Sequence, residues 1–320
     1  MPPAAVRARI SRAVLPLLAV AVLGGAATAC ATTAPGAAGG GSGTGGTGRV
    51  IQVVAAENFW GSIAGQLGGS HVHVTSVITN PATDPHDYEP TAADARTVSM
   101  ARVAVVNGIG YDTWADKLLA ANPGGDRTEL TVGDVVGVKP GGNPHRWYSP
   151  PDVREVVAAI TADYRRADPA DAAYFTARRA AFDTTALAPY DRLIADIRAR
   201  WAGTPIGASE SIVTPLAQGL GLKTLTPQSF LDAISEGSDP TAQDKATIDR
   251  QITKKQIKIY VYNSQNSTPD VQQQVREAKM AGIPVATVTE TLSPAGDSFQ
   301  QWQVRQLRDI ERALAKATGK

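Results

Sequence analysis

The chain has 320 residues, of which 43% are hydrophobic and 19% are charged, and its formal net charge is +1. A chain of this length buries enough apolar surface for one large domain or two smaller lobes. The balanced charge, without a long run of lysine and arginine, argues against a nucleic-acid-binding protein. Cys30 is the only cysteine, so a domain that begins after it has neither a disulfide nor a thiolate metal ligand.

The first 30 residues have the pattern of a secretory signal. Arginines precede an uncharged run rich in alanine, leucine and valine, which extends from Ala13 to Ala29. The run is short and interrupted by glycine and proline, which favours a cleaved signal peptide over a membrane span. Small residues before Cys30 resemble a bacterial lipobox, in which cleavage leaves an acylated cysteine. We expect residues 1–30 to be a lipoprotein signal peptide lipidated at Cys30; the alternative is an ordinary signal peptide with an incidental cysteine.

Residues 31–48 read ATTAPGAAGGGSGTGGTG and contain no charged or aromatic side chain. Such a segment cannot bury apolar surface, and its glycine content is typical of a flexible linker. We predict a tether that joins the lipid anchor to the folded body and lets that body reach a partner in the membrane.

Six apolar segments rich in β-branched residues predict strands. They are residues 49–56, 71–79, 102–108, 204–209, 258–264 and 283–290. Helical patterns separate them, such as the segment in which Val153, Val156, Val157 and Ile160 share one face. Alternation of strands and helices predicts an α/β fold with mainly parallel sheets.

The middle of the chain interrupts this alternation. Residues 169–201 contain helix-forming residues and no strand pattern, so we predict one long helix or two helices in series. Pro189 should kink or divide this helix, because proline lacks the N–H group and its ring clashes with the preceding turn. The helix would join an N-terminal lobe, residues 49–168, to a C-terminal lobe, residues 202–320. A helical hairpin within one domain is the alternative.

Four candidate ligands lie near the ends of predicted strands or in the loops between elements. His86 follows the second strand in DPHDYEP, and His145 lies in the loop sequence NPHRW. Glu210 follows the fourth predicted strand, and Glu290 closes the last one. Because ligands in open α/β sheets bind beyond the carboxyl ends of strands, a cleft between the lobes would collect all four side chains. Two imidazoles and two carboxylates suit Zn²⁺, Mn²⁺ or Fe²⁺, and the absence of sulfur argues against Cu⁺.

Other residues near these motifs admit two interpretations. Glu89 is a candidate acceptor for an imidazole N–H, and Trp147 and Asn107 are candidates for the wall of the cleft, although packing and turn roles explain them equally well. His71 and His73 alternate along one strand, which predicts a solvent-facing pair rather than a metal site.

The four candidate ligands lie in segments that resemble the zinc- and manganese-binding lipoproteins of bacterial ABC importers. The segments are DPHDYEP around His86, NPHRWYSP around His145, GASESIVTPL around Glu210 and IPVATVTETL around Glu290. The resemblance extends over the whole body after the tether. It implies two α/β lobes joined by a long, rather rigid helix, with the metal held between the lobes.

The resemblance assigns the metal ligands to His86, His145, Glu210 and Glu290. The family commonly has aspartate at the last position, so Asp297 in SPAGDSF is the alternative fourth ligand. The sequence also lacks the long histidine-rich loop of many zinc-specific members, because residues 87–143 contain no histidine. We therefore expect Mn²⁺ or Zn²⁺, with a slight preference for manganese.

The leading hypothesis is a monomeric, lipid-anchored, extracytoplasmic solute-binding protein that captures the metal and delivers it to an ABC permease in the membrane, without catalysis. One alternative is a secreted metal-dependent hydrolase, although the chain contains neither HExxH nor GxSxG. Two others are a surface adhesin with a structural metal and a binder of chelated iron.

Overall fold

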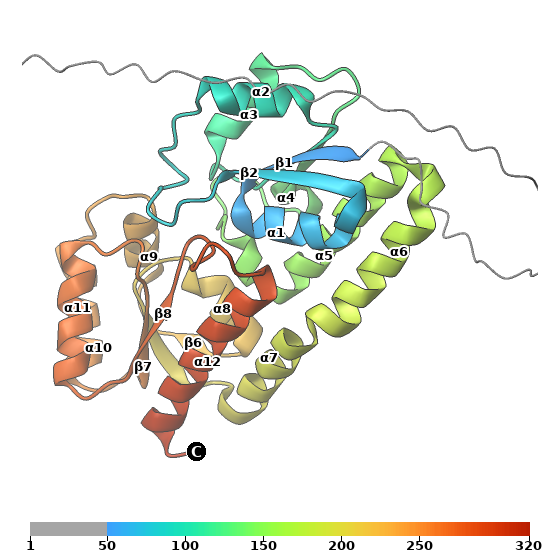
Figure 1. The fold of residues 1–320 in the computed structure, drawn as a ribbon. Coiled ribbons are helices and arrows are strands. Elements are labelled where there is room, and N and C mark those ends of the chain that lie inside the picture. The colour runs from blue at the N-terminus through green and yellow to red at the C-terminus, as the bar shows by residue number, and fades with distance from the viewer. Residues whose placement is uncertain (1–49) are drawn as a thin grey trace, which may run out of the picture. The chain divides into compact units, whose positions relative to one another are not determined.

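A computed structural model describes residues 50–320 (Figure 1). The predicted signal peptide, the lipidation site at Cys30 and the tether lie outside the described residues. Two four-stranded parallel sheets form the framework of the described part of the chain. This arrangement confirms the predicted α/β fold class with two parallel sheets.

The N-terminal sheet has the strand order β2-β1-β3-β4. Its strands are β1 Ile51–Glu57, β2 Val72–Ile78, β3 Val103–Val106 and β4 Thr128–Thr131. The central strands β1 and β3 are almost wholly buried because helices cover both faces of the sheet, which explains their largely apolar sequences. The accompanying helices are α1 Asn58–Gly68, η1 Gly69–His71, α2 Ala92–Met100, α3 Thr113–Ala121, α4 Val132–Val135, η2 Arg146–Tyr148 and α5 Pro150–Ala167.

The C-terminal sheet has the equivalent order β6-β5-β7-β8. Its strands are β5 Pro205–Ala208, β6 Lys223–Thr224, β7 Ile259–Asn263 and β8 Val285–Val288. Its helices are α8 Val213–Leu220, α9 Gln228–Ser235, α10 Ala242–Thr253, α11 Pro269–Met280 and α12 Phe299–Thr318. The six predicted strands are confirmed, whereas the short strands β4 and β6 were not predicted.

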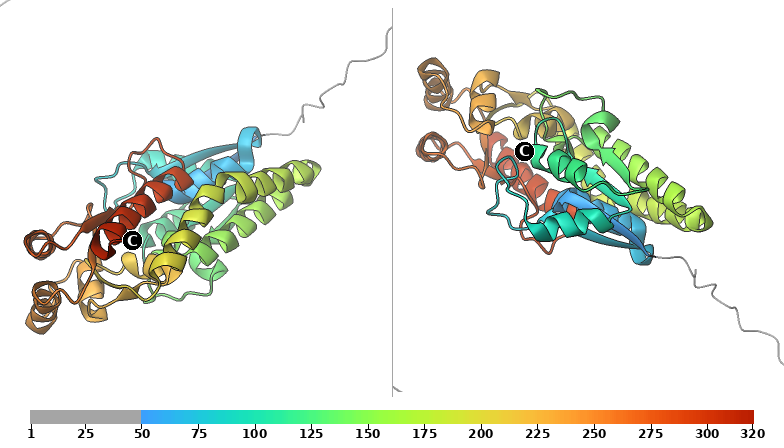
Figure 2. Two further views of the ribbon diagram at one scale, coloured as in Figure 1. Left: turned by 90° about the horizontal axis from the view of Figure 1, so that it is seen from below. Right: turned by 90° about the horizontal axis from the view of Figure 1, so that it is seen from above.

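The helical run between the sheets is divided. After the short turn η3, Pro169–Asp171, it comprises α6 Ala172–Ala181, the π-helical segment η4 Phe182–Ala186 and α7 Ala188–Trp201. Pro189 lies in the first turn of α7, where its missing N–H costs no intrahelical hydrogen bond. A π-helical segment interrupts the run just before this proline. In Figures 1 and 2 the run passes along one side of both sheets.

One apolar core continues from the first sheet to the second. At its centre Phe59 of α1 stacks on Trp147 of η2, with ring centroids 4.0 Å apart. Trp302 of α12 packs on the same cluster, and the Phe299 N–H donates to Ser62 Oγ at 2.9 Å. These contacts fix the two sheets relative to each other.

None of the helices between residues 50 and 320 combines the length and the apolar character that a membrane span requires.

Candidate metal centre

Hydrogen bonds between backbone groups and the side chains of Asp84 and Trp114 hold the His86 loop. The Asp84 carboxylate accepts a hydrogen bond from the His86 N–H at 2.9 Å, and the buried Pro85 offers its carbonyl to Trp114 Nε1 at 3.0 Å. The His86 ring meets the edge of Tyr111, with centroids 4.6 Å apart. Burial lowers the pKa of His86, so its neutral, metal-binding form is favoured.

Hydrogen bonds made by Asn107 and Asn143 position the loop and the ring of His145. The Asn107 amide donates to the Pro144 carbonyl at 3.0 Å, which anchors the loop before the histidine. Asn143 Oδ1 accepts the His145 backbone N–H at 3.0 Å and lies 2.9 Å from the ring nitrogen Nδ1. Because the Asn143 amide nitrogen donates elsewhere, to the Ser211 carbonyl, its oxygen must be the acceptor. Nδ1 therefore carries the proton, and Nε2 is left to bind a metal.

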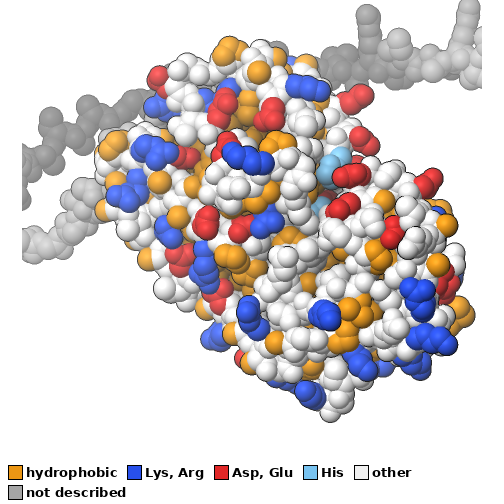
Figure 3. Space-filling view, turned by 180° about the vertical axis from the view of Figure 1, so that it is seen from behind, with side chains coloured by type: hydrophobic (Ala, Val, Ile, Leu, Met, Phe, Trp, Pro, Cys, Tyr) orange, Lys and Arg blue, Asp and Glu red, His pale blue; other side chains and the backbone are white. Residues whose placement is uncertain are grey.

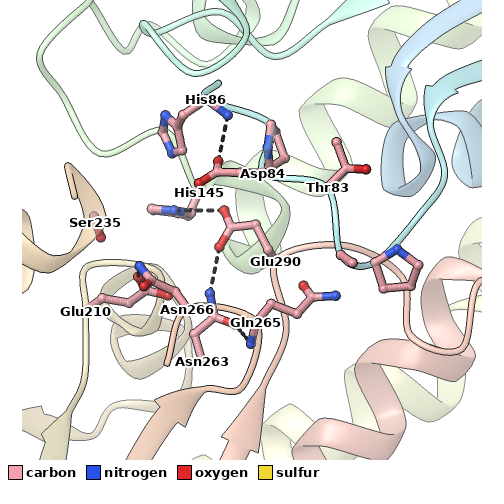
Figure 4. Close-up of a pocket in the computed structure, with 13 residues that line it drawn as sticks. Thr83, Asp84, His86, His145, Glu210, Ser235, Asn263, Gln265, Asn266 and Glu290 are labelled. Atoms are coloured by element: carbon pink, nitrogen blue, oxygen red, sulfur yellow. Dashed lines mark hydrogen bonds and ion pairs between the residues drawn. The ribbon is translucent and has the colours of Figure 1, made fainter. Parts of the chain in front are cut away.

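Glu290 extends from the end of β8 toward His145, with 3.2 Å between Glu290 Oε1 and His145 Nε2 (Figure 4). The same oxygen accepts the Tyr111 hydroxyl at 3.0 Å, and Oε2 accepts the Asn263 amide at 2.8 Å. Burial by itself raises the pKa of this carboxyl, but His145, His86 and the Tyr111 hydroxyl together bring the pKa below its ordinary value. Glu290 is therefore a buried carboxylate, ready to accept a cation.

Glu210 follows β5 and is only 1% exposed. Its Oε2 accepts the Asn266 amide at 2.7 Å, whereas its buried Oε1 has no hydrogen-bond partner among the described residues. Burial, and then the charge of Glu290, raise the pKa of Glu210 to about 8. An unpartnered buried oxygen is costly, and a bound cation at this position would satisfy it.

The structure brings three of the predicted ligands into direct proximity and places the fourth beside them. His86, His145 and Glu290 each offer a ligand atom, and these atoms lie within 4.8 Å of one another. Glu210 lines the same cavity of about 80 Å³, enough for one ion with little surrounding water. In the space-filling view a histidine surface lies in a hollow flanked by acidic side chains (Figure 3).

The alternative ligand Asp297 is not at this centre. It pairs with Arg305 and lines a separate cavity between α1, β2 and the turn before α12. Glu89 is exposed and makes no hydrogen bond to an imidazole in the described structure. Asn143, which the sequence analysis did not single out, contacts the ring of His145 instead.

The remaining candidates have supporting roles in the structure. Trp147 is fully buried beside His145, with ring centroids 5.3 Å apart, and Asn107 is buried behind the cavity rather than in its wall. His71 lies in η1 rather than in the strand, where it pairs with Asp171 at 2.7 Å. The predicted pair of solvent-facing histidines is therefore wrong for His71, while His73 is exposed.

Tyr111, another residue that the sequence analysis missed, depends on a strained loop after β3. Gly108, Ile109 and Gly110 all have positive φ, and Ile109 at 62° is unusual for a β-branched residue. The Asp112 carboxylate closes the loop by accepting the Asn107 and Gly108 N–H groups, both at 2.7 Å. The loop thereby directs Tyr111 at Glu290. The combination of asparagine, two glycines and aspartate in NGIGYD is the signal for such a turn.

A second pair of carboxyl groups lies behind the centre. Glu57 ends β1 and is wholly buried, as is Asp112. Burial and the adjacent Asp112 raise the pKa of Glu57 well above its ordinary value, and burial raises the pKa of Asp112 to about 6. Both carboxyl groups therefore keep their protons to a higher pH than ordinary glutamate and aspartate side chains do.

The two parallel sheets and the cavity of two histidines and two glutamates define a two-lobed binding protein of the α/β class. The zinc-uptake complex component A periplasmic family, ZnuA, has a family model that matches residues 53–313. The chain therefore belongs to this family, which confirms the resemblance of the sequence motifs.

Individual relatives agree with this assignment. The chain is 28% identical over 140 residues to the manganese-binding lipoprotein MntA of Halalkalibacterium halodurans, a match that covers 42% of this chain and 46% of the relative. It is 25% identical over 278 residues to the zinc-binding lipoprotein AdcA of Streptococcus pneumoniae, covering 77% of this chain and 52% of the relative. The chain thus spans about half the length of these two relatives.

A solved structure shows the same fold. The Cd-bound periplasmic metal binding protein from Candidatus Liberibacter asiaticus superimposes with a TM-score of 0.68 at 21% identity, covering 82% of this chain and 98% of that chain.

Proposed function

We propose that this protein is an extracytoplasmic solute-binding protein that captures a divalent transition metal, Zn²⁺ or Mn²⁺, and delivers it to an ABC permease. The metal is the cargo, and His86, His145, Glu210 and Glu290 are its ligands. The observation that carries the proposal is the buried, unpartnered Glu210 Oε1, which lines the cavity shared with the three clustered ligand atoms. A bound cation would satisfy this arrangement of ligand atoms.

The donor set supports binding rather than hydrolysis. A catalytic zinc site keeps one position for water, whereas two imidazoles and two carboxylates fill a tetrahedral site completely. Asn263 and Asn266, which line the same cavity, donate to the two carboxylates and hold them in place. We therefore propose that the protein is not an enzyme.

The proposed location follows from the N-terminal sequence. Lipidation at Cys30 would anchor the protein outside the cytoplasm, and residues 31–48 would let the folded body reach the permease as a monomer. The permease would receive the ion through an acidic opening next to His86. This opening is lined by Asp84, Asp87, Asp232 and Glu236.

The test is metal analysis of the purified protein, stripped with chelator and then reconstituted with Zn²⁺ or Mn²⁺. We expect one ion per chain with a Kd below about 1 μM, which corresponds to about −8 kcal/mol or stronger. Membrane extraction of wild type and Cys30→Ser tests the anchor separately: wild type should partition with the membrane and the variant should not. A protein that holds no stoichiometric metal would contradict the proposed function.

A further inference from the structure

Two asparagine amides donate hydrogen bonds to the two carboxylates of the metal centre. Both belong to the sequence NSQN that ends β7 and begins the loop before α11. Asn263 Nδ2 donates to Glu290 Oε2 at 2.8 Å, and Asn266 Nδ2 donates to Glu210 Oε2 at 2.7 Å. Each glutamate therefore has one oxygen held by an amide of the same short loop (Figure 4).

The surrounding hydrogen bonds fix the direction of both amides. Asn263 Oδ1 accepts the Gln265 N–H at 3.0 Å, so the other end of this amide must be the nitrogen that faces Glu290. Asn266 Nδ2 also reaches the Ile234 carbonyl at 3.1 Å, so it faces two acceptors, and only a nitrogen satisfies both. The two glutamate oxygens are thus held by donors.

Each glutamate consequently keeps one oxygen for a ligand. Glu290 Oε1 faces His145 Nε2 and accepts the Tyr111 hydroxyl through one lone pair, and Glu210 Oε1 is buried without a partner among the described residues. The amide occupies one lone pair of the second oxygen and fixes the orientation of the carboxylate, which favours binding of a metal through the other oxygen. Asn263 is fully buried, so the loss of its amide bond would leave a buried donor unsatisfied.

We propose that Asn263 and Asn266 determine metal specificity by limiting each glutamate to one ligand oxygen, which makes a four-coordinate site that favours Zn²⁺ over Mn²⁺. Zn²⁺ is commonly bound by four tetrahedral nitrogen and oxygen ligands, whereas Mn²⁺ suits six-coordinate oxygen-rich sites. The inference rests on the proposed function and reverses the slight preference for manganese that the sequence motifs indicated.

The experiment measures Zn²⁺ and Mn²⁺ affinities by competition with a chelator in wild type, Asn266→Leu, Asn266→Ala and Asn263→Ala. Leucine keeps the branched shape and the number of heavy atoms of asparagine and removes the donor, so it serves if the alanine variant fails to fold. The matched control is Gln272→Ala, which removes an exposed amide bonded to the Ser267 carbonyl of the same loop and touches neither carboxylate. X-ray absorption spectra of the Zn²⁺-loaded proteins report the number of ligand atoms.

The ratio of the Zn²⁺ and Mn²⁺ affinities is the decisive readout, because damage to the fold alone weakens the binding of both metals alike. We expect the preference for Zn²⁺ over Mn²⁺ to fall at least about tenfold in each asparagine variant, as expected for the loss of a hydrogen bond to a charged group. The control should keep the wild-type ratio, and wild type should show four ligand atoms around zinc.

An unchanged ratio in variants that still bind metal, or more than four ligand atoms in wild type, would overturn the specificity role and leave the proposed function intact. Absence of metal binding by wild type would instead refute the proposed function itself.

Discussion

The Tyr111 hydroxyl donates to Glu290 Oε1 at 3.0 Å and thereby joins the loop after β3 to the end of β8. The two residues are 179 positions apart in the sequence. This bond links the N-terminal sheet to the C-terminal sheet at the metal cavity, and the Tyr111 ring also contacts His86. Tyr111 therefore organises the cavity before any ion enters.

Replacement of Tyr111 by phenylalanine should destabilise the metal-free protein. A hydrogen bond to a charged group contributes about 1.5–3 kcal/mol, so we expect the free energy of unfolding in chelator to fall by about 2 kcal/mol. Urea denaturation measures this change. Tyr190→Phe is the matched control, because the buried Tyr190 hydroxyl has no hydrogen-bond partner among the described residues. Equal losses in the two variants would contradict the role of Tyr111.

The Glu57–Asp112 pair should make the metal-free protein less stable as pH rises. Both pKa values are raised in the folded state, that of Asp112 from 3.8 to about 6, so the native protein binds more protons than the unfolded chain. The free energy of unfolding therefore falls with increasing pH from about pH 4 through 6 and beyond.

The variant Glu57→Gln isolates this effect, because glutamine has nearly the shape of glutamate and does not ionise. We expect the variant to show a shallower decline between pH 5 and 8 than wild type, measured by urea denaturation in chelator. Parallel pH profiles for the two proteins would contradict the raised pKa of Glu57.

Metal binding should release a proton at neutral pH. The pKa of Glu210 is raised to about 8, so this carboxyl is mostly protonated at pH 7 and must lose its proton to bind a cation. The affinity should therefore rise up to about tenfold per pH unit below pH 8 and level off above it. Calorimetry in buffers of different ionisation enthalpy measures the release. In Glu210→Gln the release should disappear, and persistence of the same release would assign it to another group.

The framework of this fold was predictable because burial determines the sequence pattern of its central strands. The strand β3 is apolar throughout and β1 is apolar apart from Gln52 and Glu57, whereas β4 reads TELT and β6 has only two residues, too few for a pattern. The sequence motifs placed His86 and His145 near the ends of elements, and the structure brings both to one cavity.

The residues that hydrogen-bond to the two glutamates were not predictable, because they come from distant parts of the chain. Asn266 lies 56 positions from Glu210, and nothing local to either residue indicates their contact. Conversely, a residue close in sequence can lie outside the site. Asp297 is near Glu290 in sequence, but it forms an ion pair with Arg305 of α12. Proximity along the chain also suggested Glu89, whose side chain is exposed.

The most direct test of the metal centre compares His145→Ala with Asp297→Asn. Metal content by mass spectrometry and the thermal shift on adding Zn²⁺ would be measured for both variants and wild type. The structure predicts one ion per chain and a clear thermal shift in wild type and Asp297→Asn, and loss of both in His145→Ala. Full metal binding by a folded His145→Ala protein, or its loss in Asp297→Asn alone, would contradict the assigned centre.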